Sequence, residues 1–103
     1  MISDIFTPNK NNFIKAIKSG NLPKCQWFFE QISTIKYINQ LFQCSCKYGH
    51  LHITQWLLQI QPNINISAEN NYAFRWSCNN GHLEITQWLL QHKPDIDISA
   101  KNE

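Results

Sequence analysis

Four residues of the types that bind zinc lie within one short stretch of the chain: Cys44, Cys46, His50 and His52. Thiolate and imidazole groups are common protein ligands of Zn²⁺, so this spacing suggests a metal site. Residues two apart on a helix point about 200° away from each other, which keeps Cys44 and Cys46 from reaching one ion. The Cys46–His50 pair also recurs 32 residues later, as expected of residues that pack a repeated structure. We therefore expect no metal and no other cofactor.

A cysteine beside a histidine can also act as a nucleophile with its general base. That chemistry needs an accessible thiol with a lowered pKa. Cys25 and Cys78 lie in apolar helical segments, where we expect them to be packed rather than reactive. The histidine that follows Gly49 and Gly81 is better suited to tie a loop through a hydrogen bond. The sequence therefore predicts that the protein is not an enzyme.

The strongest feature of the sequence is an internal repeat. The 23-residue segments that begin at Gly49 and at Gly81 are identical at 16 positions, with a period of 32 residues. Their apolar residues are retained, and nearly all the differences exchange one polar residue for another. An earlier copy around Gly20 keeps the same order of a Phe, a Gly, a Leu and a Trp. The chain therefore contains three copies of one structural unit.

Each copy has the pattern of two short helices. In the third copy, Phe74, Ser77 and Cys78 recur at i, i+3 and i+4, which predicts one packing face of a helix over residues 72–80. A glycine ends that helix, and a proline ends the next one. The apolar stripe of the second helix consists of Leu83, Ile85, Trp88, Leu89 and Leu90.

In the first copy, Thr7 before Pro8 predicts a helix N-cap with proline at the first helical position. The two helices of this copy are expected over residues 9–19 and 22–32. Helices this short are unstable alone in water, so each must bury its stripe against the neighbouring copy. The sequence therefore predicts an all-α fold in which helix pairs stack into a solenoid.

Trp27, Trp56 and Trp88 occupy the same position in the three copies. Exposed aromatic rings can stack on nucleic-acid bases. Their constant place in the apolar stripe instead predicts that all three are buried between copies, because large aromatic side chains dominate such packing. Trp76 has no counterpart in the other copies, which leaves local packing and partial exposure both open for it.

The charge distribution gives no sign of a nucleic-acid partner. Nine basic and seven acidic residues leave a formal net charge of +2, and the basic residues form no run. No apolar stretch approaches the ~18 residues of a membrane span, and the first residues have no signal-peptide pattern. We therefore expect a cytoplasmic protein with four free thiols, which binds neither nucleic acid nor a membrane.

The second and third copies resemble the ankyrin repeat. The family's Gly-His, second-helix and connecting motifs are matched by Gly81-His82, Leu83-Glu84-Ile85, Leu89-Leu90 and Asp95-Ile96-Asp97. The resemblance covers approximately residues 11–103. It implies a protein–protein interaction scaffold without enzymatic activity. Its fold would be an ankyrin-like helix-turn-helix solenoid of about three stacked repeats.

The resemblance also implies one domain over residues 1–103, with repeats at approximately 8–38, 39–70 and 71–103. The narrower pattern of a Trp ahead of Leu-Leu, with ISAxN loops, resembles the divergent ankyrin arrays of giant DNA viruses of amoebae (mimivirus-like). A viral origin would imply a host protein as the partner and the host cytoplasm as the location.

The chain departs from the family pattern in three ways. Tyr72-Ala73 replaces the usual Thr-Pro, and Arg75 or Gln43 stands in place of the histidine that ties repeats together. The glycine of the usual hairpin is missing, and the period falls one residue below the typical value of about 33. We therefore expect a shortened loop where ankyrin proteins project a β-hairpin finger.

Binding is expected at exposed positions that vary between copies, because core positions of a solenoid are committed to neighbouring repeats. In ankyrin proteins the residues just before the Gly and the loop tips line the concave surface. Tyr48 is the best candidate, since a rigid aromatic ring with a polar end suits an interface anchor. For each candidate, the alternative is an ordinary solvated residue. The full set of protein-binding candidates is Lys47, Tyr48, Glu69, Asn70, Asn71, Arg75, Trp76, Asn79 and Asn80.

Nothing in the sequence caps the outer face of residues 72–91, although terminal repeats usually carry a polar outer face. An uncapped apolar end favours self-association. The alternative function is therefore a structural, self-assembling repeat, or a fragment of a longer ankyrin array.

Overall fold

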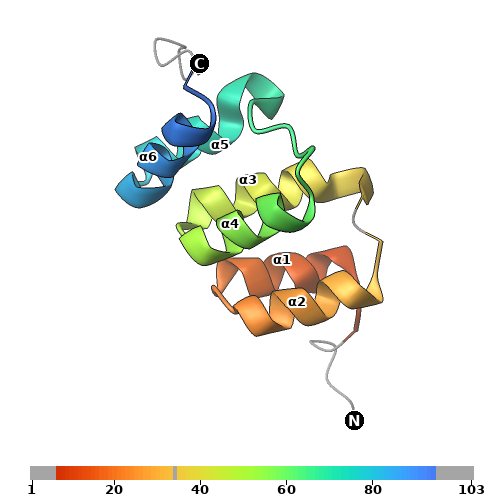
Figure 1. Cartoon of the computed structure of the whole chain (residues 1–103). Coiled ribbons are helices and arrows are strands. Elements are labelled where there is room, and N and C mark those ends of the chain that lie inside the picture. The colour runs from red at the N-terminus through yellow and green to blue at the C-terminus, as the bar shows by residue number, and fades with distance from the viewer. Residues whose placement is uncertain (1–6, 34, 95–103) are drawn as a thin grey trace.

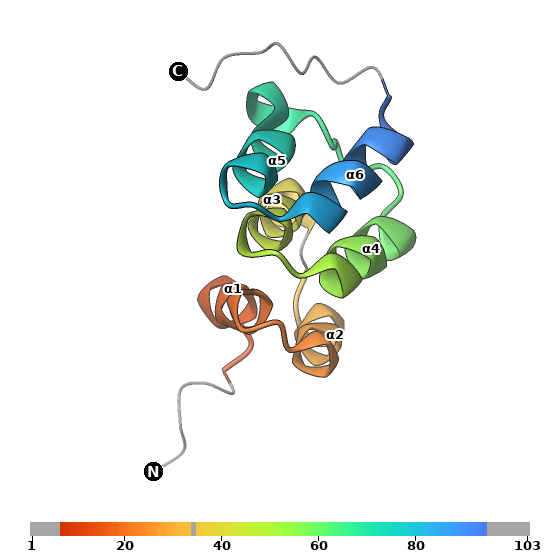
Figure 2. The same ribbon diagram turned by 90° about the vertical axis from the view of Figure 1, so that its left-hand side faces the viewer.

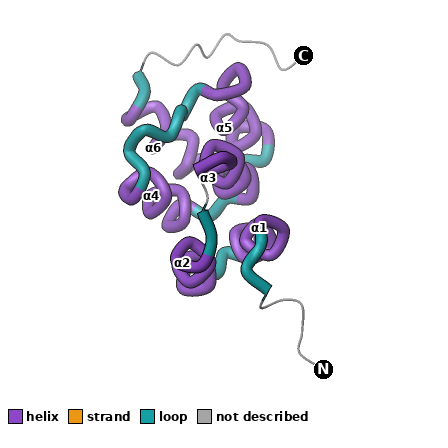
Figure 3. Tube along the Cα trace, turned by 90° about the vertical axis from the view of Figure 1, so that its right-hand side faces the viewer, coloured by secondary structure: helices purple, strands orange, loops and turns teal. Residues whose placement is uncertain are grey.

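The computed structural model describes residues 7–33 and 35–94, which form three helix pairs stacked in one row (Figure 1). The pairs are α1 (Lys10–Lys18) with α2 (Leu22–Gln31), α3 (Ile38–Tyr48) with α4 (Leu51–Ile60), and α5 (Ala68–Asn79) with α6 (Leu83–His92). The 3₁₀ turn η2 (Ile35–Tyr37) precedes α3. The described residues contain helices and loops and no strand (Figure 3), which confirms the all-α prediction.

The helices form two columns (Figure 2). The first helices α1, α3 and α5 lie in one column, and the second helices α2, α4 and α6 lie in the other. Helix α3 packs against both α1 and α5, and α4 packs against both α2 and α6. The middle pair is therefore covered on both sides. This arrangement gives each short helix the neighbours that it needs to be stable.

The core runs through all three pairs between the two columns. Each pair contributes apolar side chains that are almost completely buried, and the middle pair contributes the most. The largest fully buried apolar side chains are Phe13, Ile17, Phe28, Leu41, Phe42, Ile53, Leu57, Ile85 and Leu89. None of the described helices has both the length and the apolar character needed to cross a bilayer.

The predicted N-cap of the first helix is wrong. The cap is Asn9, whose side-chain oxygen accepts a hydrogen bond of 2.8 Å from the Asn12 backbone amide. Thr7 contributes its backbone carbonyl instead, which accepts a bond of 3.0 Å from the Asn12 side chain. An Asn carboxamide satisfies the free amides of the first turn, so the helix begins two residues later than the Thr-Pro pattern suggests. The expected helices over 9–19 and 22–32 still agree with α1 and α2 to within one residue.

The loop between the second and third pairs also differs from the usual ankyrin finger. Residues 61–67 form turns without any strand, as the missing hairpin glycine predicts. Glu69, Asn70 and Asn71 follow with positive φ values of 56–60°, a left-handed turn that precedes regular helix from residue 72. Such a conformation costs about 1–2 kcal/mol per non-glycine residue. The predicted helix over 72–80 therefore corresponds to the right-handed part of α5.

The prediction that all three repeated tryptophans are buried is wrong for Trp27, which is 39% exposed, and holds only in part for Trp56 and Trp88, which are half-buried. Trp56 meets Phe29 of the preceding pair edge-on, with ring centroids 5.7 Å apart. Trp88 lies 6.4 Å from the ring of Phe42, also in the preceding pair. Trp56 and Trp88 thus pack against the pair before their own. No pair precedes α1 in the described part of the chain, so Trp27 lies partly in solvent.

At the other end of the stack, two further predictions of burial are wrong. Leu83 is 67% exposed, although its counterparts Leu22 and Leu51 are half-buried. Cys78 is exposed, although its counterpart Cys46 is buried. Both positions lie in α5 and α6, the last helix pair of the described residues. The described residues contain no pair after α6, so the same side chains lie in solvent.

Candidate functional site

The second and third helix pairs are each joined to the preceding pair by a histidine. The Nε2 atom of His50 lies 2.8 Å from the Lys18 carbonyl oxygen, and that of His82 lies 3.0 Å from the Lys47 carbonyl oxygen. A carbonyl only accepts, so Nε2–H is the donor in both bonds. These bonds confirm the prediction that the histidine after Gly ties the loops.

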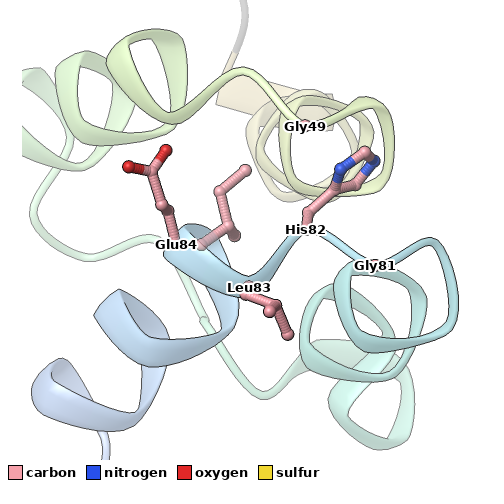
Figure 4. Close-up of a pocket in the computed structure, with 6 residues that line it drawn as sticks. Gly49, Gly81, His82, Leu83 and Glu84 are labelled. Carbon is pink, nitrogen blue, oxygen red and sulfur yellow. The ribbon is translucent and has the colours of Figure 1, made fainter.

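The glycine at each joint makes room for the imidazole ring. A Cβ atom added at Gly49 would lie 2.5 Å from Cε1 of His82. Figure 4 shows the His82 ring directed toward Gly49, while Leu83 and Glu84 point elsewhere. The hollow of about 320 Å³ beside this joint is lined by the same residues. Because its histidine already bonds a carbonyl, the hollow is a packing feature of the joint.

Sequence reasoning missed a second repeated contact inside the pairs. The hydroxyls of Ser45 and Thr54 lie 2.8 Å apart, and those of Ser77 and Thr86 lie 3.1 Å apart. Each threonine hydroxyl also donates to the carbonyl of the histidine four residues earlier. The sequence did contain a signal for this contact, because both later copies have the same Ser and Thr at these positions. They connect the two columns and leave the outer faces free for other contacts.

Three of the four cysteines lie in surroundings that disfavour the thiolate. Burial raises the pKa of Cys25 to about 12 and that of Cys46 to about 12, so both thiols remain protonated at neutral pH. Burial also raises the pKa of Cys44, although Lys18 and Lys47 act in the opposite direction. Thiolate is the nucleophilic and metal-binding form of cysteine. Within residues 7–33 and 35–94, no three His, Cys, Asp or Glu side chains are grouped so as to hold a metal ion.

A groove of about 360 Å³ crosses the column of first helices. Its side chains come from all three pairs. They are Asn11, Ile14 and Lys18 of α1, Gln40, Gln43, Cys44, Lys47 and Tyr48 of α3, and Tyr72 of α5. The groove therefore lies on the side of the molecule where binding was expected.

Aromatic rings and ammonium groups gather along this groove. Tyr48 is 39% exposed, and the Nζ atoms of Lys18 and Lys47 lie 5.3 and 5.8 Å from the centre of its ring. Lys47 Nζ also lies 4.5 Å from the Trp76 ring, which is 5.9 Å from the ring of Tyr72. We call these five residues the first-helix surface. Cation–π contacts of this kind hold the lysine side chains over the rings.

The floor of the groove contains an unsatisfied polar group. Gln43 is only 5% exposed, and its Nε2 atom has no hydrogen-bond partner among the described residues. A buried donor without an acceptor costs about 1–3 kcal/mol. The side chain thus carries a penalty that an acceptor brought by a bound molecule would remove.

The structure separates the predicted binding residues into two groups. Lys47, Tyr48 and Trp76 lie together on the first-helix surface. Arg75 instead donates two hydrogen bonds, of 2.8 and 3.3 Å, to the carbonyls of Asn70 and Glu69. It therefore holds the left-handed turn in which the predicted loop residues Glu69, Asn70 and Asn71 lie.

Of the two asparagines before the third glycine, Asn80 forms a hydrogen bond with the preceding pair. The side chain of Asn80 donates a bond of 2.9 Å to the Lys47 carbonyl, the same oxygen that His82 reaches. Asn79 is exposed. Sequence reasoning placed Lys18 among the residues just before a glycine that line the concave surface, and it missed Gln43 and Tyr72 as groove residues. The available signal was the spacing of residues 40, 43, 44, 47 and 48, which places them on one face of a helix.

Charge is distributed unevenly between the two columns. The first helices carry Lys10, Lys15, Lys18, Lys47 and Arg75 against Glu69. The second helices carry Lys24 against Glu30 and Glu84. The side of the molecule that contains the groove is therefore the basic side.

Comparison with known proteins identifies one family. The family model described as ankyrin repeats in three copies matches residues 13–102. No curated protein and no solved structure matches the chain. The match extends over all three helix pairs and includes both histidine joints.

Proposed function

Because the chain belongs to the ankyrin-repeat family, we propose that it is a non-enzymatic protein–protein interaction module that binds through the first-helix surface. Ankyrin repeats generally mediate binding to other proteins. The observation that carries the proposal is that Tyr48 and Lys47 line an open groove, with the Trp76 ring 4.5 Å from Lys47 Nζ. Aromatic side chains with a polar end are frequent anchors of protein interfaces.

The finer resemblance to the arrays of giant DNA viruses extends this proposal. A viral ankyrin module of this kind would act on a host protein in the host cytoplasm. The buried cysteine thiols are compatible with a reducing compartment. Expression of the tagged protein in an amoeba, followed by imaging and cross-linking, would locate it and its partner.

The proposal predicts that Tyr48→Ala weakens binding of a captured partner protein by about ten-fold or more, as expected for an interface anchor. Trp27→Ala is the matched control, because Trp27 is exposed to the same fraction of 39% but lies on α2, in the other column. Partners retained from lysate by the immobilised wild-type chain would be purified, and their dissociation constants measured by surface plasmon resonance. Equal losses for both variants would contradict the surface assignment.

A second candidate function, self-assembly, is favoured by the exposed end of the third pair. Leu83 is 67% exposed, and an added Cβ at Gly81 would meet nothing within 4 Å. However, Asn21 stands where the later pairs have His50 and His82. The α1–α2 end of another copy therefore lacks the imidazole that fills each joint, which disfavours head-to-tail stacking.

Self-assembly through this end has a direct test. If it occurs, Leu83→Gln should shift the protein from concentration-dependent oligomers to monomers in sedimentation equilibrium. The Gln59→Ala variant, altered at an exposed residue of α4 in the middle pair, provides the comparison. A wild-type protein that stays monomeric over the whole concentration range would exclude this function.

A further inference from the structure

We infer that the groove of the first-helix surface binds an extended acidic peptide segment of the partner, with a carboxylate between Lys18 and Lys47 and a carbonyl on Gln43. This inference rests on the proposed function, since it names the chemistry of the partner at the same surface. It depends on three features of the groove that ordinary solvent-exposed helix residues do not have. These are the paired ammonium groups, the orphan amide, and the apolar side chains beside them.

The ammonium groups of Lys18 and Lys47 converge on one aromatic ring. They come from different helix pairs, yet both Nζ atoms lie within 6 Å of the centre of the Tyr48 ring. The two ring distances, 5.3 and 5.8 Å, place the ammonium groups no more than about 11 Å apart, so a carboxylate between them is attracted to both. The described acidic side chains do not compete for this position, because Glu30, Glu69 and Glu84 do not line the groove.

The Gln43 amide supplies a second recognition element at the floor. Its side chain is more than nine-tenths buried, lines the groove, and has an Nε2 atom without a described partner. A main-chain carbonyl of a bound peptide is a neutral acceptor that can approach such a donor. Recognition by a buried donor is selective, because a ligand without an acceptor would leave the amide unpaired.

The remaining side chains define the shape and polarity of the segment. Ile14 and Tyr72 line the two ends of the groove on α1 and α5, and both are half-buried. Adjacent helix axes lie about 8–10 Å apart, so a ligand that crosses three helices spans about 16–20 Å. At about 3.3 Å per residue, five or six residues of extended chain cover that distance. The expected segment therefore combines an acidic residue with apolar residues on either side.

An oligonucleotide fits these features less well. Base stacking needs an open aromatic face. Lysine ammonium groups lie over the rings of both Tyr48 and Trp76. Nucleic-acid binding also relies on an extended basic surface. The formal net charge of the chain is only +2.

The test begins with selection from a phage library of random twelve-residue peptides on the full chain. We expect the selected peptides to be enriched in Asp or Glu next to apolar residues. Fluorescence anisotropy with one selected peptide then measures affinity. The double variant Lys18→Gln, Lys47→Gln should weaken binding by about ten-fold or more. The control Lys15→Gln, Lys36→Gln makes the same charge change on exposed residues outside the groove, and should change affinity less than about two-fold.

The Gln43→Leu variant separates recognition from folding. It removes the orphan donor while keeping a side chain of similar volume, so the urea midpoint of unfolding should rise. The affinity for the selected peptide should fall by about three-fold or more. A residue with only a structural role would instead lose stability and leave the affinity unchanged.

The failures of the two proposals are distinguishable. Selected peptides without acidic enrichment would overturn the acidic-peptide inference and leave the binding surface in place. The same conclusion follows if the lysine and Gln43 variants bind the peptides with unchanged affinity while Tyr48→Ala binds them more weakly. Peptides unaffected by Tyr48→Ala as well would overturn both. A selection that yields no binder, or a single-stranded oligonucleotide that binds more tightly than every selected peptide, would also overturn the inference.

Discussion

Phe42→Ala should remove about 3–5 kcal/mol from the free energy of unfolding, the usual cost of truncating a buried Phe. The Phe42 ring is fully buried in the middle pair, and it also contacts Trp88 of the third pair. Its loss therefore leaves a cavity that two pairs share. A chain of this length has a total stability of about 5–15 kcal/mol, so this variant should lose a large share of it. Urea unfolding followed by circular dichroism measures the change.

Phe74→Ala is the matched control, because Phe74 occupies the same position in the third copy. Its side chain is only half-buried, so less apolar surface returns to water and the cavity is smaller. We expect a loss of about 1–2 kcal/mol, on the basis of the area that it buries. Equal losses for the two variants would show that position in the stack does not control stability.

Gly49→Ala should cost about 2–3 kcal/mol, for two separate reasons. Gly49 ends α3 with φ +85°, a left-handed conformation that strains any residue with a Cβ atom. The added methyl would also lie 2.5 Å from Cε1 of His82. The imidazole can move away only by giving up its 3.0 Å hydrogen bond to the Lys47 carbonyl.

Gly81→Ala isolates the first of these reasons. Gly81 has a similar φ of +75°, but an added Cβ would meet nothing within 4 Å. This variant should therefore cost only the conformational strain, about 1–2 kcal/mol. The difference between the two variants in urea unfolding measures the Gly-His joint, about 1 kcal/mol for one hydrogen bond. If Gly81→Ala is as destabilising as Gly49→Ala, the joint makes no contribution of its own.

Stability and binding use different residues of the same helix. On α3, Phe42, Ser45 and Cys46 are buried between the columns, while Lys47 and Tyr48 reach the groove. The helical period separates the two sets. Gln43 is the exception, because it is buried and yet lines the groove. That position combines a cost in stability with a donor available for a ligand.

Much of the fold followed from the sequence, because its determinants are local. The spacing of the repeated Phe, Gly, Leu and Trp predicted six short helices in three pairs, and the bounds of α1 and α2 were correct to within one residue. The Gly-His motif predicted the hydrogen bonds that tie the loops. Such features depend on residues close in the chain or on the pairing of identical units, so pattern alone determines them.

Exposure at the two ends, and the composition of the groove, were decided by the tertiary structure. Trp27 and Leu83 have the same types as their half-buried counterparts, and they are exposed at ends of the stack where no neighbouring pair is described. Lys18 and Tyr48 are 30 residues apart in the sequence, yet the stacking of α1 on α3 brings an ammonium group over the ring. A repeat pattern specifies what each unit can bury. Which side chains meet across units depends on how the helices stack, because contacts between pairs form only in the assembled solenoid.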